Sequence, residues 1–114
     1  MRLELLDQDG VTVARIEGDI DFESAADLGP DILRSLPDSA IGLVLDLTAV
    51  PYADSGGVRA FFEIAAHLAI SGRRVALAVP ETSPIRRLIK ITRLEEVVVL
   101  CTSAEECGEM LRQG

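Results

Sequence analysis

The sequence has few of the side chains on which catalysis, metal binding and disulfide cross-linking depend. It contains one histidine and two cysteines in 114 residues. Cys101 and Cys107 are too few for a disulfide framework or a zinc site, so we expect both to be small buried hydrophobic residues. We therefore expect neither a bound metal ion nor a cofactor.

Long apolar runs and an excess of positive charge are also missing. No apolar run approaches the roughly 20 residues that span a bilayer, and the first residues enter an alternating strand pattern without the form of a signal peptide. The 11 basic and 19 acidic residues give a net charge of −8, which argues against nucleic-acid and anionic-membrane partners. We expect a cytoplasmic protein, not inserted in a membrane, whose charge suits a basic protein partner or serves solubility alone.

Apolar periodicity predicts an α/β fold. With nearly half of the residues apolar, the chain has a globular composition, and its length indicates a single domain over residues 1–114. We expect strands over 3–6, 11–18, 41–47, 74–79 and 97–100, and helices over 24–36, 55–70, from 84 onward and over 103–111. Asp9-Gly10 is a hairpin signal. The order predicts a small mixed, mostly parallel sheet of about five strands, with an antiparallel first hairpin and about four flanking helices.

The first expected helix contains two signals that bear on its start and its course. Ser24 followed by Asp27 resembles a capping box, so we expect the helix to begin at Ser24. Pro30 lies inside the apolar pattern, and an interior proline costs about 3 kcal/mol. We therefore expect a kink there, or a helix that restarts at Pro30.

The segment 51–57 is the main candidate for a functional site. Asp54, Ser55, Gly56 and Gly57 follow a strand that is apolar on both faces and precede an amphipathic helix. Unpaired N–H groups and the positive end of the helix dipole meet at such a place. A serine there suits a nucleophile, a phosphate-binding turn or a phosphorylation site.

Two of these interpretations fit the residues poorly. A serine hydrolase needs a histidine base beside the nucleophile, but His67 lies twelve residues further along the same helix, about 18 Å away along its axis. His67 is thus expected to be a partly exposed helix residue. The two glycine-rich motifs that bind nucleotides, G-x-x-x-x-G-K-(S/T) and G-x-G-x-x-G, are both absent. Asp54 would also repel a free anion at the turn.

A phosphorylated Ser55 fits better. Gly56 and Gly57 leave the serine hydroxyl open, and Asp19 and Asp21 follow another strand, so both loops can share one surface. A phosphate would add roughly two negative charges to an acidic patch. The same aspartates also fit a simpler interpretation as solvated residues with turn and capping duties.

The chain resembles STAS domains, and more narrowly the bacterial anti-sigma factor antagonists, over about Leu3 to Leu111. The motifs that carry the resemblance are Glu17-Gly18-Asp19-Ile20-Asp21, Leu43-Val44-Leu45-Asp46-Leu47, Asp54-Ser55-Gly56-Gly57-Val58, Val75-Ala76-Leu77 and Ile85-Arg86-Arg87-Leu88. The first and third motifs, at this separation, form a fairly specific pair.

The resemblance implies a phosphorylation-switched binding protein with no catalytic activity of its own. In that family the serine at the position of Ser55 is phosphorylated by an anti-sigma factor that is also a serine kinase. The unphosphorylated form binds this kinase and so releases a sigma factor for transcription, and a serine phosphatase resets the switch. The resemblance places Asp21 and Asp54 at the partner contact beside Ser55, and we expect the contact to include Asp19, Gly56, Gly57 and Arg59 as well. A dimer is compatible with the sequence.

Three positions depart from the family pattern. Gly56 stands where the family usually has Ser or Thr, Arg59 replaces a small residue, and Thr92-Arg93-Leu94 replaces Ser-Gly-Leu. Some STAS domains are unphosphorylated scaffold subunits of lipid-transport, ABC-transport or stress-signalling assemblies, which is the alternative expectation. A small enzyme is a third.

Overall fold

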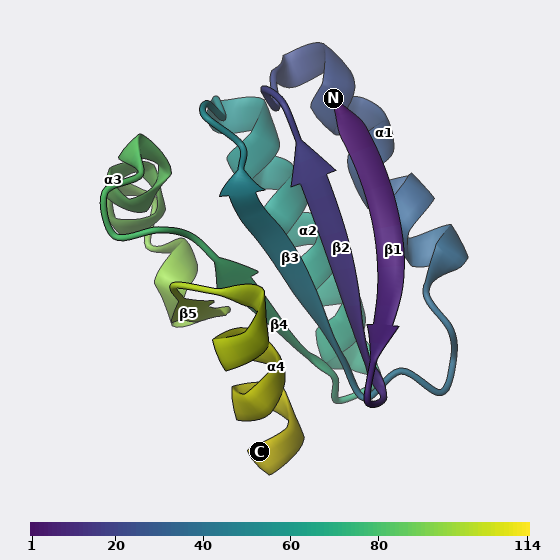
Figure 1. Ribbon diagram of the computed structural model, residues 1–114. Helices are drawn as coiled ribbons and strands as arrows, with labels where there is room; N and C mark the ends of the chain where they lie inside the picture. Colours follow the sequence, from purple (N-terminus) through teal and green to yellow (C-terminus); the bar gives the residue numbers. More distant parts are fainter.

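The computed structural model describes residues 1–114 as a five-stranded sheet with helices on both faces (Figure 1). In chain order the elements are β1 (Arg2–Gln8), β2 (Val11–Glu17), α1 (Phe22–Ser35), β3 (Gly42–Ala49), α2 (Ser55–Ile70), β4 (Arg74–Ala78), α3 (Pro84–Ile91), a 3₁₀ turn (Leu94–Glu96), β5 (Val99–Cys101) and α4 (Ala104–Gln113). The spatial order is β1-β2-β3-β4-β5. Only the β1–β2 pair is antiparallel, so the predicted mixed sheet is confirmed.

Local turn chemistry explains how the strands begin to pair. Asp9 and Gly10 both have positive φ, 52° and 90°, which is the backbone of the tight hairpin turn that joins β1 to β2. Every later strand pair is parallel and is connected through a helix. The carboxyl ends of β2 and β3 therefore point to the same edge of the sheet, at the top of Figure 1.

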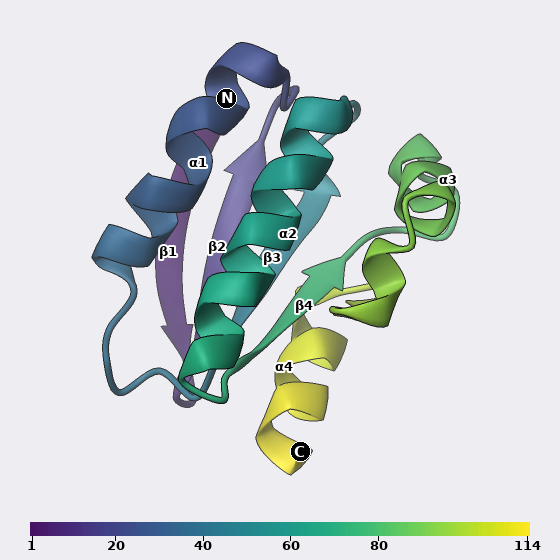
Figure 2. The same cartoon turned by 180° about the vertical axis from the view of Figure 1, so that it is seen from behind.

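The two faces of the sheet are covered unequally. Helices α1 and α2 lie side by side on one face (Figure 2), and the larger apolar core fills the space beneath them, with Leu28, Ile32, Phe61, Ile64 and Leu68 fully buried. Helix α4 covers part of the other face over a smaller cluster. Because helices lie on both faces of the sheet, β3 is buried along residues 42–47, as its apolar sequence predicts.

Both cysteines lie in the smaller cluster beneath α4. Cys101 and Cys107 are buried, and neither forms a disulfide. Burial raises the pKa of both thiols, most strongly that of Cys107. The prediction that they are small buried hydrophobic residues is confirmed.

The structure corrects the predicted start of the first helix and excludes a restart at Pro30. Helix α1 begins at Phe22, not at Ser24, because Asp21 is the N-cap. The Asp21 side chain accepts from the Ser24 N–H, and the Asp21 N–H donates to the Ser24 hydroxyl, so the capping box precedes the predicted one by three residues. The helix also runs through Pro30 without restarting. Gly29 favours this because it has no Cβ to meet the proline ring.

Strand β5 also differs from its predicted position. It covers Val99–Cys101 instead of 97–100. Arg93 adopts a left-handed conformation with φ of 62°, and the 3₁₀ turn that follows uses the Leu94 carbonyl to accept from the N–H groups of Val97 and Val98. Val97 is therefore held in the turn and is exposed.

Candidate functional site

The loops that follow β2 and β3 are hydrogen-bonded to each other. The Gly18 N–H donates to the Ala49 carbonyl at 3.1 Å, and the Ile20 N–H donates to the Tyr52 carbonyl at 2.9 Å. The Asp54 N–H donates to the Ile20 carbonyl at 3.1 Å. These bonds extend the parallel pairing beyond the strands, so the first turns of α1 and α2 start next to each other (Figure 2).

Asp54 links the two helix starts through its carboxylate. It is the N-cap of α2, and its Oδ1 accepts from the N–H groups of Gly56 and Gly57 at 2.9 and 3.2 Å. Its Oδ2 accepts from the N–H of Phe22, the first residue of α1, at 3.0 Å. Each oxygen therefore caps a different helix, which sets the position of α1 relative to α2.

The two aspartates of the other loop have different roles. Asp21 caps α1, and its hydrogen bonds from the backbone and side chain of Ser24 lower the pKa of its carboxyl group. Asp19 is exposed and forms no hydrogen bond or ion pair within the chain. Asp19 is thus free to contact another molecule, whereas one oxygen of the Asp21 carboxylate already accepts hydrogen bonds from Ser24.

Ser55 occupies the first position of α2 and is exposed. Its hydroxyl forms no hydrogen bond within the chain. The nearest N–H groups of the helix, those of Gly56 and Gly57, are occupied by Asp54. The Ser55 side chain is therefore exposed to solvent at the capped N-terminus of α2, where a modifying enzyme could reach it.

The glycines after Ser55 are required by the close approach of the preceding loop and of α1. A Cβ on Gly56 would lie 2.9 Å from the Cα of Phe22, closer than real Cβ atoms come to backbone. A Cβ on Gly57 would lie 3.0 Å from a methyl group of Ile20. Gly56 thus leaves the room that α1 needs to pack tightly against the start of α2.

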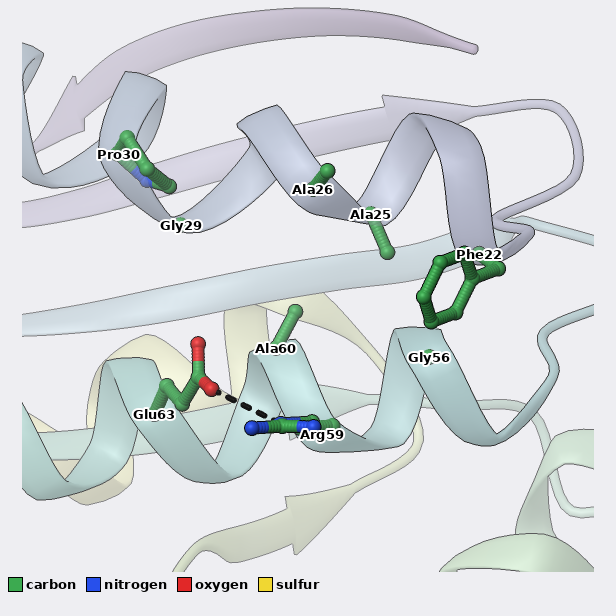
Figure 3. Close-up of a pocket in the computed structure, with 9 residues that line it drawn as sticks. All are labelled: Phe22, Ala25, Ala26, Gly29, Pro30, Gly56, Arg59, Ala60 and Glu63. Carbon is green, nitrogen blue, oxygen red and sulfur yellow. Dashed lines mark hydrogen bonds and ion pairs between the residues drawn. The ribbon is translucent and has the colours of Figure 1, made fainter.

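A groove runs between α1 and α2, and at the start of α2 it is lined by Gly56, the residue after Ser55 (Figure 3). Its volume is about 180 Å³, and Phe22, Gly56, Arg59 and Glu63 are among its lining residues. The Phe22 ring is 75% exposed although it is the largest apolar side chain of this surface. Arg59 Nε forms an ion pair with Glu63 Oε1 at 3.2 Å, one turn further along α2.

Seven of the nine residues that line the groove, Phe22 and Glu63 among them, were not expected from the sequence. The signal for Phe22 is present: an aromatic residue directly follows Asp21. A helix that begins at Ser24, as the sequence predicts, leaves Phe22 outside it. Of the seven expected residues, Asp19, Asp21, Asp54, Ser55, Gly56 and Gly57 belong to the two adjoining helix starts, and Arg59 lies one turn below Ser55.

The arrangement offers no catalytic partner to Ser55. His67 is exposed and lies in the last turn of α2, at the opposite end of the helix. No three His, Cys, Asp or Glu side chains are grouped as metal ligands. None of the helices combines the length and the apolar character needed to cross a bilayer.

Comparison with known proteins identifies the family and agrees with the fold. The STAS domain family model matches residues 2–107. An anti-sigma factor antagonist from Mycobacterium paratuberculosis is 29% identical with a TM-score of 0.81, covering 97% of this chain and 93% of that chain. The anti-sigma factor antagonist SpoIIAA in its unphosphorylated form is 19% identical with a TM-score of 0.68, covering 99% of each chain. A sulfate transporter family protein from Wolinella succinogenes is 18% identical with a TM-score of 0.76, covering 96% of this chain and 93% of that chain.

Proposed function

The chain belongs to the STAS domain family, and from that premise we propose that it is an anti-sigma factor antagonist switched by phosphorylation of Ser55. The unphosphorylated protein binds an anti-sigma factor that is a serine kinase, and so releases a sigma factor in the cytoplasm. A serine phosphatase restores the binding form. The observation that carries the proposal is the Ser55 hydroxyl, which is exposed and unbonded at a capped helix start. The antagonist that shares 29% of its sequence with this chain supports the role.

The partner surface consists of the two helix starts and the groove between them. Asp19, Asp21 and Asp54 make it acidic, so the matching surface of the kinase is expected to be basic. The exposed Phe22 ring supplies the apolar contact that commonly anchors an interface. Phosphorylation at Ser55 then acts at the centre of this surface.

The capped helix explains why a phosphate would change binding and not folding. Because Asp54 already accepts from Gly56 and Gly57, a phosphate on Ser55 does not gain these two helix N–H groups. A docked partner would have to bury roughly two added negative charges. Burying an unpaired charge costs several kcal/mol, and about 3 kcal/mol weakens binding more than 100-fold.

The modification is an ordinary phosphoryl transfer in which this chain is the substrate. The Ser55 Oγ forms a bond to the γ-phosphorus of ATP on the kinase while the bond between that phosphorus and the bridging oxygen of ADP breaks. The hydroxyl proton passes to a base of the kinase. The chain supplies only the nucleophilic oxygen, so no catalytic residue is needed around Ser55.

The test compares three variants against candidate anti-sigma factor kinases of the same genome. We expect Ser55→Ala to bind with wild-type affinity and to gain no 80 Da phosphate in intact-mass analysis after incubation with kinase and ATP. Ser55→Asp should lose binding in calorimetry and keep its melting temperature. Ser39→Asp, at an exposed serine in the loop between α1 and β3, is the matched control and should bind normally. Normal binding by Ser55→Asp would exclude the switch.

A second candidate function is an unphosphorylated scaffold subunit of a transport assembly. It is supported by the sulfate transporter family protein, which has the same fold. The two functions differ in what Ser55 does, because a scaffold subunit would remain unmodified with every kinase tested. A neighbouring kinase gene favours the first function, and neighbouring transporter genes favour the second.

A further inference from the structure

Three side chains spaced by four residues form a row on the exposed surface of α2. Ser55, Arg59 and Glu63 follow one another at successive turns, and residues four apart on a helix are neighbours. Arg59 and Glu63 are 79% and 66% exposed and form an ion pair with Nε and Oε1 3.2 Å apart (Figure 3). Arg59 thus has a potential anionic neighbour on each side, and only the one at Glu63 is charged in the unmodified chain.

Arg59 is the only basic side chain in the two loops and at the starts of α1 and α2, since Arg34 lies in the last turn of α1. The charged side chains there are Asp19, Asp21, Glu23, Asp54, Arg59 and Glu63, and the N-terminal amino group lies on the side of Asp21. The N–H groups of Gly56 and Gly57, which could otherwise bind a phosphate, are bonded to Asp54. The basic side chain on the same helix that lies one turn from a phosphate on Ser55 is Arg59.

We propose that phosphorylation of Ser55 moves Arg59 from its ion pair with Glu63 to an ion pair with the phosphate. This inference rests on the proposed modification of Ser55. Three physical reasons favour the exchange. A phosphate carries roughly twice the charge of a carboxylate. Side chains on a helix tilt toward its N-terminus, where Ser55 lies. A helical ion pair is also more favourable when the acidic group precedes the basic one by four residues, an order that phosphorylated Ser55 and Arg59 satisfy and that Arg59 and Glu63 reverse.

The exchange would spread the effect of one phosphate along the groove. When Arg59 turns toward the phosphate, the Glu63 carboxylate loses its partner. Ser55 and Glu63 are separated by two turns, about 12 Å along the helix axis. Phosphorylation then changes the charge at both ends of the groove that Phe22 and Arg59 line. A partner that binds across the groove would meet the phosphate at Ser55 and an unpaired carboxylate at Glu63.

The test uses protein with phosphoserine incorporated at position 55 during translation, so that no kinase is needed. The second pKa of the phosphate is measured by ³¹P NMR titration at low salt. Arg59→Gln should raise this pKa by about 0.3, the size expected from one helical ion pair, and Glu63→Gln should lower it. Arg34→Gln is the control, since Arg34 is an exposed arginine that pairs with Asp31 in the last turn of α1, and should leave the phosphate pKa unchanged.

A second measurement follows the arginine itself. The Arg59 Nε–H resonance in a ¹⁵N spectrum should move when phosphoserine replaces Ser55 and should return toward its original position at 1 M salt, where exposed ion pairs are screened. The inference is wrong if Arg59→Gln leaves the phosphate pKa within 0.1 (about the reproducibility of such titrations), or if Arg34→Gln changes it equally. A failure of the proposed function would be seen separately, as a Ser55 that no kinase modifies, because these measurements do not depend on a kinase.

Discussion

The bond from the Phe22 N–H to Asp54 can be tested by replacing one carboxylate oxygen. Asp54→Asn keeps the shape of the side chain and one oxygen, but an amide cannot accept at both sides. If the oxygen stays with Gly56 and Gly57, the amide nitrogen faces the Phe22 N–H, and the bond of 3.0 Å is lost. If the amide flips, the helix cap is lost instead. Either orientation loses at least one bond, so we expect reduced stability.

The expected loss follows from the number of bonds each variant breaks. Asp54→Ala removes the α2 cap, worth about 1 kcal/mol, and also the bond to Phe22, which adds about 1 kcal/mol because its acceptor is charged but partly solvated. We therefore expect a loss of about 2 kcal/mol for Asp54→Ala and about 1 kcal/mol for Asp54→Asn. In urea the smaller loss corresponds to a fall in the unfolding midpoint of roughly 0.5–1 M.

A double-mutant cycle isolates the bond between the helices. Phe22→Pro removes the N–H that Asp54 accepts, and proline is well tolerated at the first position of a helix. The preceding residue, Asp21, already has the extended backbone that a following proline requires. Urea unfolding of the four proteins should show that Asp54→Asn costs about 1 kcal/mol less when residue 22 is proline. An equal cost in both backgrounds would refute the assignment of the bond.

Two further predictions concern the same helix starts. Gly56→Ala should destabilise the protein by about 1–3 kcal/mol in urea unfolding, because the added Cβ meets the Phe22 backbone at 2.9 Å. Gly108→Ala in α4 is the control and should be neutral or stabilising, because there the nearest atom is the flexible end of Arg112; equal losses would contradict this. Folding lowers the pKa of Asp21. The Asp21 carboxylate therefore contributes its full stabilisation above the pKa of an unfolded aspartate, about 3.9. This stabilisation is lost as the pH falls through the lower pKa that Asp21 has in the folded protein. The urea midpoint of the wild type should therefore fall more steeply below about pH 4 than that of Asp21→Asn, and parallel profiles would contradict this.

Features that depend on near neighbours in the chain were predictable. Asp9-Gly10 indicates the hairpin, and Ser83 with Pro84 indicates the start of α3, because each of these signals acts through bonds or steric limits within a few residues. The apolar run in β3 indicates a strand covered on both faces. The Asp54-Ser55 motif, read together with the second acidic loop, was enough to indicate the family.

Features that depend on contacts between distant residues were not predictable. Asp21 and Ser24 are both good helix caps, and the chain uses Asp21 while Ser24 completes the capping box. The N–H groups on either side of Asp21 bond to residues far along the chain: that of Ile20 to the Tyr52 carbonyl and that of Phe22 to Asp54. The exposed Phe22 ring and the groove between α1 and α2 follow from that choice.

The amino-acid sequence by itself determined the order of strands and helices, and a serine next to an aspartate at the start of the second helix, because hydrophobic periodicity and capping act locally. Only the tertiary structure decided that two loops about 30 residues apart share hydrogen bonds, that Gly56 has no room for a side chain, and that Phe22, Arg59 and Glu63 border one groove. The physical reason is that each of these properties belongs to a pair of segments, and a pair acquires it only when packing on the sheet brings both segments together.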